Sequence, residues 1–159
     1  MKARRPGSVL VSVEGGTAGY AARIVRAAAV RQLARAGASG ELSVLLVGDA
    51  AMRRLNRSYR GKDRATDVLS FPQGGGVLGD VVISLQTARR QAREGGWPLS
   101  RELRQLVAHG ILHCLGHEHG DARGAQRMAA AERRLLGTDG MVGVTLAAAK
   151  SVSSKRRLR

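Results

Sequence analysis

The amino-acid sequence predicts a single α+β domain in which about four strands are packed with helices. Its 159 residues suit one domain and are enough to bury a hydrophobic core. Short apolar runs alternate along the chain with longer segments of helical character, and no segment is repeated. No window approaches the ~18–20 uncharged apolar residues of a membrane span, and the single cysteine excludes an intrachain disulfide. We therefore expect a cytoplasmic protein with no membrane partner.

Four segments have the apolar composition and the flanking turn residues that are typical of strands. They are residues 8–13, 41–47, 67–71 and 77–83. The second is nearly continuously apolar, which predicts a strand covered on both faces. Pro72 ends the third, and the three glycines at 74–76 form a turn before the fourth.

Five segments are predicted to be helices, each bounded by capping or breaking residues. They are residues 18–36, 49–55, 84–94, 98–115 and 122–136. Asp49 and Ser84 are the predicted N-caps of the second and third helices. Gly37 and Gly116 follow the ends of the first and fourth. Residues 57–66 are polar and basic and have neither period, which predicts a loop.

Positive charge is in large excess, with 27 lysines and arginines against 12 aspartates and glutamates. Residues 1–149 form the predicted domain, and residues 150–159 are predicted to be a basic, disordered tail. The net charge of +15 favours a polyanionic partner that is bound through phosphates with strong salt dependence. An arginine bias from GC-rich coding is the alternative. Only four aromatic residues are present, so base stacking has little material.

All four histidines lie within eleven residues, from His109 to His119. On the predicted helix, His109 and His113 are four positions apart, so their side chains share one face and can bind one ion. Gly116 can adopt the left-handed conformation that ends the helix and returns His119 as a third ligand. Three neutral imidazoles with an open fourth position are typical of a catalytic zinc site. We predict one Zn²⁺ per chain on His109, His113 and His119.

Several alternatives to this zinc site follow from the same residues. His117 is an alternative to His119 as the third ligand. Cys114 projects toward the apolar face of the helix, where packing is its preferred role. The spacing H-x3-H-x5-H is also that of the metzincin proteases. Because Gly110 stands where such a protease needs glutamate as general base, peptidase activity is only the runner-up.

Three sequence blocks, read together, resemble a known family. The blocks are Leu55-Asn56-x-x-Tyr59-Arg60-Gly61-Lys62-Asp63-x-x-Thr66-Asp67-Val68-Leu69-Ser70-Phe71-Pro72, Leu78-Gly79-Asp80-Val81-Val82-Ile83-Ser84 and His109-Gly110-x-Leu112-His113-x-x-Gly116-x-x-His119. In this order they resemble the YbeY family of bacterial rRNA maturation factors and metal-dependent endoribonucleases, over about residues 41–136. The departures are Glu118 where the family usually has Asp, His117 where it often has Tyr, and Ala65 where Pro is usual.

The resemblance implies a zincin-like α+β fold with a mixed sheet. It also implies a role in rRNA processing, chiefly at the 3′ end of the 16S small-subunit rRNA, and in ribosome quality control. The implied partners are small-subunit rRNA, the small ribosomal subunit and its assembly factors, and no DNA. The functionally important arginine of the family falls on Arg60. Five further basic residues surround it, and a solvated basic face is the alternative role for these: Arg53, Arg54, Arg57, Lys62 and Arg64.

The resulting prediction is an endoribonuclease that acts on single-stranded RNA. A metal on the three histidines would polarise a phosphoryl oxygen or activate water, and Arg60 would offset the developing negative charge. No carboxylate is identified as a general base, and none is required if the substrate's 2′-hydroxyl is the nucleophile. The alternatives are a metzincin-like metallopeptidase and a non-catalytic ribosome-assembly factor whose metal site is mainly structural.

Overall fold

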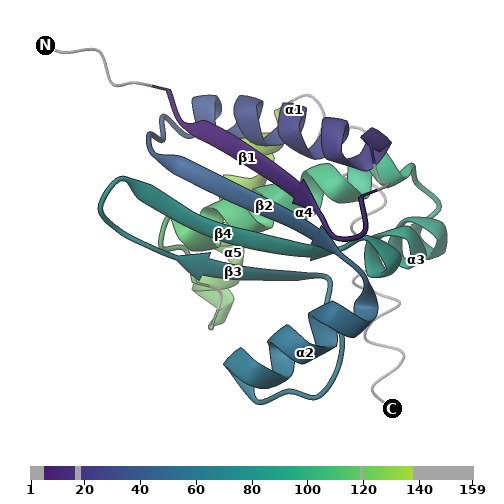
Figure 1. Cartoon of the computed structure of the whole chain (residues 1–159). Helices are drawn as coiled ribbons and strands as arrows, with labels where there is room; N and C mark the ends of the chain where they lie inside the picture. The colour runs from purple at the N-terminus through teal and green to yellow at the C-terminus, as the bar shows by residue number, and fades with distance from the viewer. Residues whose placement is uncertain (1–5, 17–18, 119, 138–159) are drawn as a thin grey trace, which may run out of the picture.

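The structure is a computed structural model that describes residues 6–16, 19–118 and 120–137. The helices and strands of this part of the chain are β1 (Ser8–Val13), α1 (Gly19–Arg35), β2 (Glu41–Val47), α2 (Asp49–Arg60), β3 (Val68–Pro72), β4 (Val77–Ser84), α3 (Leu85–Gly95), α4 (Leu99–Cys114) and α5 (Ala122–Leu136) (Figure 1). Within the described residues, no helix is long and apolar enough to cross a membrane. The predicted tail at 150–159 lies outside the described residues.

The four strands form one mixed sheet in the order β1-β2-β4-β3. β1 pairs parallel to β2, and β2 pairs parallel to β4. After β3, the chain turns at Gly75 and Gly76, which have positive φ angles of 68° and 89°, and β4 returns antiparallel to β3. Pro72 is the last residue of β3, where it is tolerated because β3 is an edge strand. The predicted mixed sheet is confirmed.

Helices cover the two faces of the sheet unequally (Figure 1). The large core lies between one face and helices α1 and α4, with α3 and α5 contributing at its sides, and includes Leu42, Val44 and Leu46 of β2. A smaller cluster lies under α2 on the other face and includes Val47 of β2 and Met52 of α2. The prediction that the strand at 41–47 is covered on both faces is therefore correct only at its C-terminal end, because on the α2 side Val47 is buried while Ser43 and Leu45 are half-buried.

The beginning of α2 differs from its prediction. The N-cap is Gly48, and Asp49 is the first helical residue, so the assignment of Asp49 as N-cap is wrong. Its side chain instead accepts hydrogen bonds of 2.7 Å from Ser84 Oγ, from Thr87 Oγ1 and from the Arg90 guanidinium. The Arg90 bond is the main reason that the pKa of Asp49 falls to about 2. The carboxylate thus joins α2 to the start of α3.

The end of α2 also differs, because the helix runs to Arg60 and not to residue 55. Residues 57–60 were expected to begin a loop, and they form the last turn of the helix. Buried Asn56 extends the packed face beyond Met52, and the Tyr59 ring packs edge-on to Phe71 of β3 with centroids 5.0 Å apart. Gly61 then ends the helix with a φ of 66°, a left-handed conformation that favours glycine.

Candidate active site

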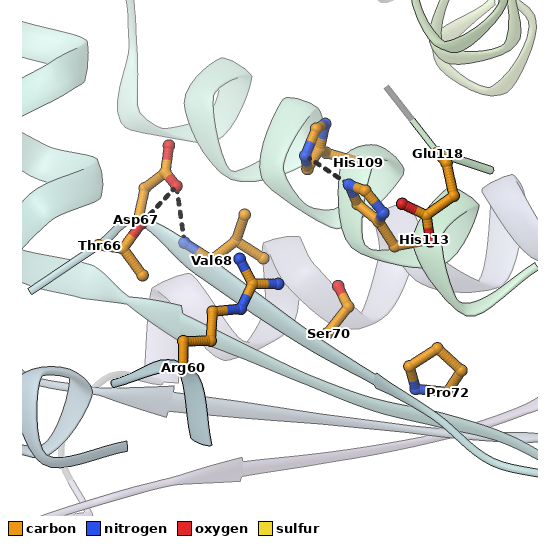
Figure 2. Close-up of a pocket in the computed structure, with 9 residues that line it drawn as sticks. All are labelled: Arg60, Thr66, Asp67, Val68, Ser70, Pro72, His109, His113 and Glu118. Carbon is orange, nitrogen blue, oxygen red and sulfur yellow. Dashed lines mark hydrogen bonds between the residues drawn. The ribbon is translucent and has the colours of Figure 1, made fainter. Parts of the chain in front are cut away.

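A cleft of about 360 Å³ lies between α4, β3 and the end of α2. Its lining residues are Arg60, Thr66, Asp67, Val68, Ser70, Pro72, His109, His113 and Glu118. Figure 2 shows His109, His113 and Glu118 on the α4 side of the cleft, with Arg60 pointing toward the histidines from the opposite side. The cleft therefore brings together the predicted arginine and two of the three predicted metal ligands.

His109 and His113 lie one turn apart on α4, as their spacing predicts. Their Nε2 atoms are 3.0 Å apart and their ring centroids 4.6 Å apart. The helix carries them at the edge of its buried face, because Leu106 and Ile111 of the same helix lie in the core. Both imidazoles are half-buried, so each packs against protein on one side and faces the cleft on the other.

Glu132 of α5 is a further member of the site that the sequence analysis missed. Its Oε1 lies 2.8 Å from Nδ1 of His109, and its Oε2 accepts a hydrogen bond of 2.9 Å from Gln105 Nε2. Only 16% of its side chain is exposed. A signal existed in the sequence, because Glu132 follows Met128 by one turn and so lies on the buried face of the predicted helix at 122–136. A charge on such a face needs a partner.

The segment after α4 contains the third predicted ligand. Gly116 has a φ of 93°, the left-handed conformation that the sequence predicts there. His119, the predicted third ligand, lies outside the described residues. His117 is half-buried, and its backbone N–H donates to the Leu112 carbonyl at 2.9 Å. Glu118, in contrast, lines the cleft beside His113.

The donor set in the cleft suits a small transition-metal cation. Among the residues that the structure describes, no three His, Cys, Asp or Glu side chains are grouped as metal ligands. The two Nε2 atoms that it does describe lie close enough for one ion, since a Zn–N bond is about 2.0–2.1 Å long. A carboxylate on the far nitrogen of His109 is also the usual surrounding of a histidine ligand. The two described imidazoles therefore fit a transition-metal ion as two of its ligands.

Cys114 stands next to His113 but belongs to the packing of the core. Its thiol lies against Gly79 of β4, where an added Cβ would be 2.8 Å from Sγ. Burial, with a smaller contribution from Asp80, raises the pKa of Cys114 to about 11. The expected packing role of Cys114 is confirmed.

Arg60 reaches the cleft from the last turn of α2, which corrects its predicted place in a loop. The chain after it is held by Asn56, whose side chain donates to the Arg64 carbonyl at 2.9 Å. Asn56 is only 2% exposed, so this bond is a buried anchor. The anchor places the end of α2 beside the start of β3, where Thr66 and Asp67 also line the cleft.

Asp67 is a carboxylate of the cleft, but its oxygens are already engaged. Oδ1 accepts from the Val68 N–H at 2.8 Å, and Oδ2 accepts from Gln91 Nε2 at 3.2 Å. Ser70, the next polar residue of β3, donates from its hydroxyl to the Gly110 carbonyl at 3.4 Å. These bonds hold β3 against α3 and α4.

Gly110 follows the first histidine, where a metzincin protease has its catalytic glutamate. A Cβ at this position would lie 2.6 Å from Cγ1 and 2.9 Å from Cγ2 of Val81. Because Val81 is fully buried in β4, the helix can approach the sheet this closely only with glycine. The packing thus leaves no room for the glutamate that peptide hydrolysis uses.

Comparison with known proteins assigns the chain to a family. The sequence profile described as Endoribonuclease YbeY matches residues 16–139. A relative named Endoribonuclease YbeY from Myxococcus xanthus is 50% identical over 147 residues, which cover 87% of this chain and 50% of the relative. One of the same name from Anaeromyxobacter sp. (strain Fw109-5) is 48% identical over 145 residues, 87% of this chain and 76% of the relative.

A solved structure agrees with the fold. The solution structure of TM1509 from Thermotoga maritima matches with a TM-score of 0.57 and 23% identity, and the match covers 85% of this chain and 93% of that one. At this identity the likeness supports the fold alone. The profile covers most of the chain, and relatives at about half identity share the cleft-bearing region. The chain therefore belongs to the endoribonuclease YbeY family, whose members are hydrolases that act on RNA.

Proposed function

We propose that this protein is a zinc-dependent endoribonuclease that cleaves single-stranded regions of rRNA, chiefly in maturation of the 3′ end of the small-subunit rRNA. The observation that carries the proposal is the cleft in which His109 and His113 face Arg60. A metal cation held by the histidines on one side of the cleft and the Arg60 guanidinium on the other would suit a phosphodiester, whose non-bridging oxygens carry the negative charge.

His109 and His113 would hold the metal, together with His119. When bound, zinc supplies a Lewis acid that polarises a phosphoryl oxygen and lowers the pKa of a bound water. The guanidinium of Arg60 offsets the negative charge that develops on the phosphoryl group, with a planar fork of N–H donors that matches phosphate geometry. The half-buried position of the two histidines limits the water around this reaction and strengthens these interactions.

RNA carries a nucleophile of its own, because its 2′-hydroxyl is adjacent to the scissile phosphate. The engaged oxygens of Asp67, the residue before β3, support a reaction that does not depend on this carboxylate as general base. Products that end in a 2′,3′-cyclic phosphate would identify transesterification, and products that end in a free 2′,3′-diol, with a 5′-phosphate on the other fragment, would identify direct hydrolysis.

The charge of the chain supports a large anionic partner. Its formal net charge of +15 favours association with the phosphates of rRNA. We place the protein in the cytoplasm, with the small ribosomal subunit and its assembly factors as partners.

Metal content and RNA cleavage test the proposal together. We expect about one zinc per chain and cleavage of a single-stranded RNA that stops with a chelator and returns with added Zn²⁺. His113→Ala should lose both the zinc and the cleavage. His117→Ala should keep both, and an equal loss in that variant would identify His117 as a ligand. Chelator-resistant cleavage, or full zinc content in His113→Ala, would contradict the proposal.

A further inference from the structure

Glu132 contacts the site from α5, a helix that contributes no side chain to the lining of the cleft within the described residues. Both of its carboxylate oxygens contact side chains of α4, one His109 Nδ1 at 2.8 Å and the other Gln105 Nε2 at 2.9 Å. Gln105 and His109 are one turn apart on α4, so a single carboxylate spans two positions of the helix that carries the metal ligands.

The backbone that carries Glu132 is fixed by packing on both sides of it. Met128, one turn before, and Leu136, one turn after, are buried in the large core. Arg35 of α1 adds a bond of 2.7 Å from its guanidinium to the Leu135 carbonyl. The carboxylate is therefore held against His109 by a rigid helix, which is what an orienting group requires.

The contact determines which nitrogen of His109 carries the proton. An ionised carboxylate can only accept hydrogen bonds, so Nδ1 of His109 must donate to Glu132. In a neutral imidazole, Nε2 then presents its lone pair to the cleft, which is the form that binds a metal. The Nε2 atom of His109 lies 3.0 Å from Nε2 of His113, so this lone pair is directed at the space that both imidazoles share.

We propose that Glu132, itself held by Gln105, is a positioning residue that locks the ring and the tautomer of His109 so that Nε2 faces the metal. The inference rests on the metal site of the proposed function. Glu132 touches neither the metal nor the RNA in this arrangement, and it acts through His109. A merely structural ion pair would contribute to stability and would leave the histidine tautomer and the zinc affinity unchanged.

Glu132→Gln separates these two roles. The variant keeps the size of the side chain but replaces an obligate acceptor by an amide that also donates. His109 can then exchange between tautomers, because the amide can donate to Nδ1 as well as accept from it. Glu94→Gln is the matched control, since Glu94 is an exposed residue of α3 outside the lining of the cleft.

The first measurement is ¹⁵N NMR of the histidine side chains in the metal-free protein. We expect His109 protonated on Nδ1 in the wild type and in Glu94→Gln. In Glu132→Gln the His109 signals should move toward a mixture of the two tautomers. The second measurement is Zn²⁺ affinity by competition with a chromophoric chelator. Here Glu132→Gln should bind about 10- to 100-fold more weakly, while Glu94→Gln stays within twofold of the wild type.

Gln105→Ala keeps the inference testable if Glu132→Gln does not fold. It removes one bond to the carboxylate and leaves the charge, so we expect a smaller loss of Zn²⁺ affinity with the His109 tautomer unchanged. Wild-type tautomers and wild-type Zn²⁺ affinity in Glu132→Gln would overturn the inference. If the wild type itself binds no Zn²⁺, the proposed function fails, and the tautomer measurement alone decides whether Glu132 orients His109.

Discussion

Gly110→Ala adds one methyl group where α4 meets the sheet. The new Cβ would lie 2.6 and 2.9 Å from the two methyl carbons of Val81, although carbon atoms in contact prefer about 3.5–4.0 Å. Overpacking of this kind costs about 1–3 kcal/mol, and alanine recovers up to about 1 kcal/mol through its higher helix propensity. We therefore expect a net loss of about 1–2 kcal/mol in the free energy of unfolding. The helix carries His109 beside this contact, so Zn²⁺ affinity should fall as well.

A double-mutant cycle isolates the contact. Urea unfolding followed by circular dichroism would be measured for the wild type, Gly110→Ala, Val81→Ala and the double variant. Val81→Ala leaves a cavity that the new methyl group fills in part. The loss of unfolding free energy in the double variant should therefore be about 1–2 kcal/mol smaller than the sum of the losses in the two single variants. Effects that add to within about 0.5 kcal/mol would refute the steric explanation.

Three further outcomes follow from the structure. The pKa of Asp49 lies near 2 instead of 3.8, so Asp49→Asn should cost about 1–2 kcal/mol at neutral pH after allowance for solvent screening. A depressed carboxylate pKa stabilises the fold above about pH 4. The difference in unfolding free energy between the variant and the wild type, measured in urea, should therefore shrink from pH 4 to pH 2. A difference that stays constant with pH would show that the lowered pKa of Asp49 is not the cause. Arg60→Ala should keep zinc and melting temperature while single-turnover RNA cleavage falls roughly 100-fold or more, and Arg57→Ala at saturating RNA should cleave nearly normally; equal losses would indicate a diffuse phosphate clamp. Asn56→Ala should destabilise the fold by about 1–3 kcal/mol, because it removes a buried side chain together with its bond to the Arg64 carbonyl. It should also slow cleavage through the displaced Arg60. Normal unfolding in urea would argue against a buried anchor.

Elements with an unambiguous local pattern were predicted at the bounds that the structure shows. The strands at 8–13 and 41–47 and the helix at 122–136 agree residue for residue, because continuous apolar runs and capping residues mark their ends. The last turn of α2 was not predicted, since its arginines carry no apolar period. Its stability depends on the packing of Tyr59 on Phe71 and on the bond from Asn56 to Arg64, and both partners belong to a later part of the chain.

The pairing of His109 with His113 was determined by sequence alone, because a helix places residues four apart on one face whatever surrounds it. The four strands could likewise be predicted from local apolar runs and turn residues. The sequence itself shows that Gly110 stands where a protease of this type has its glutamate. Tertiary structure decided the rest: Arg60 faces the histidines because α2 and β3 are anchored together, and Glu132 reaches His109 because α5 packs beside α4. Glu132 is 23 residues from His109 in the sequence, and Arg60 is 49 residues from it. Local propensity carries no information on such distances, since they arise only when separate apolar faces are buried in one core.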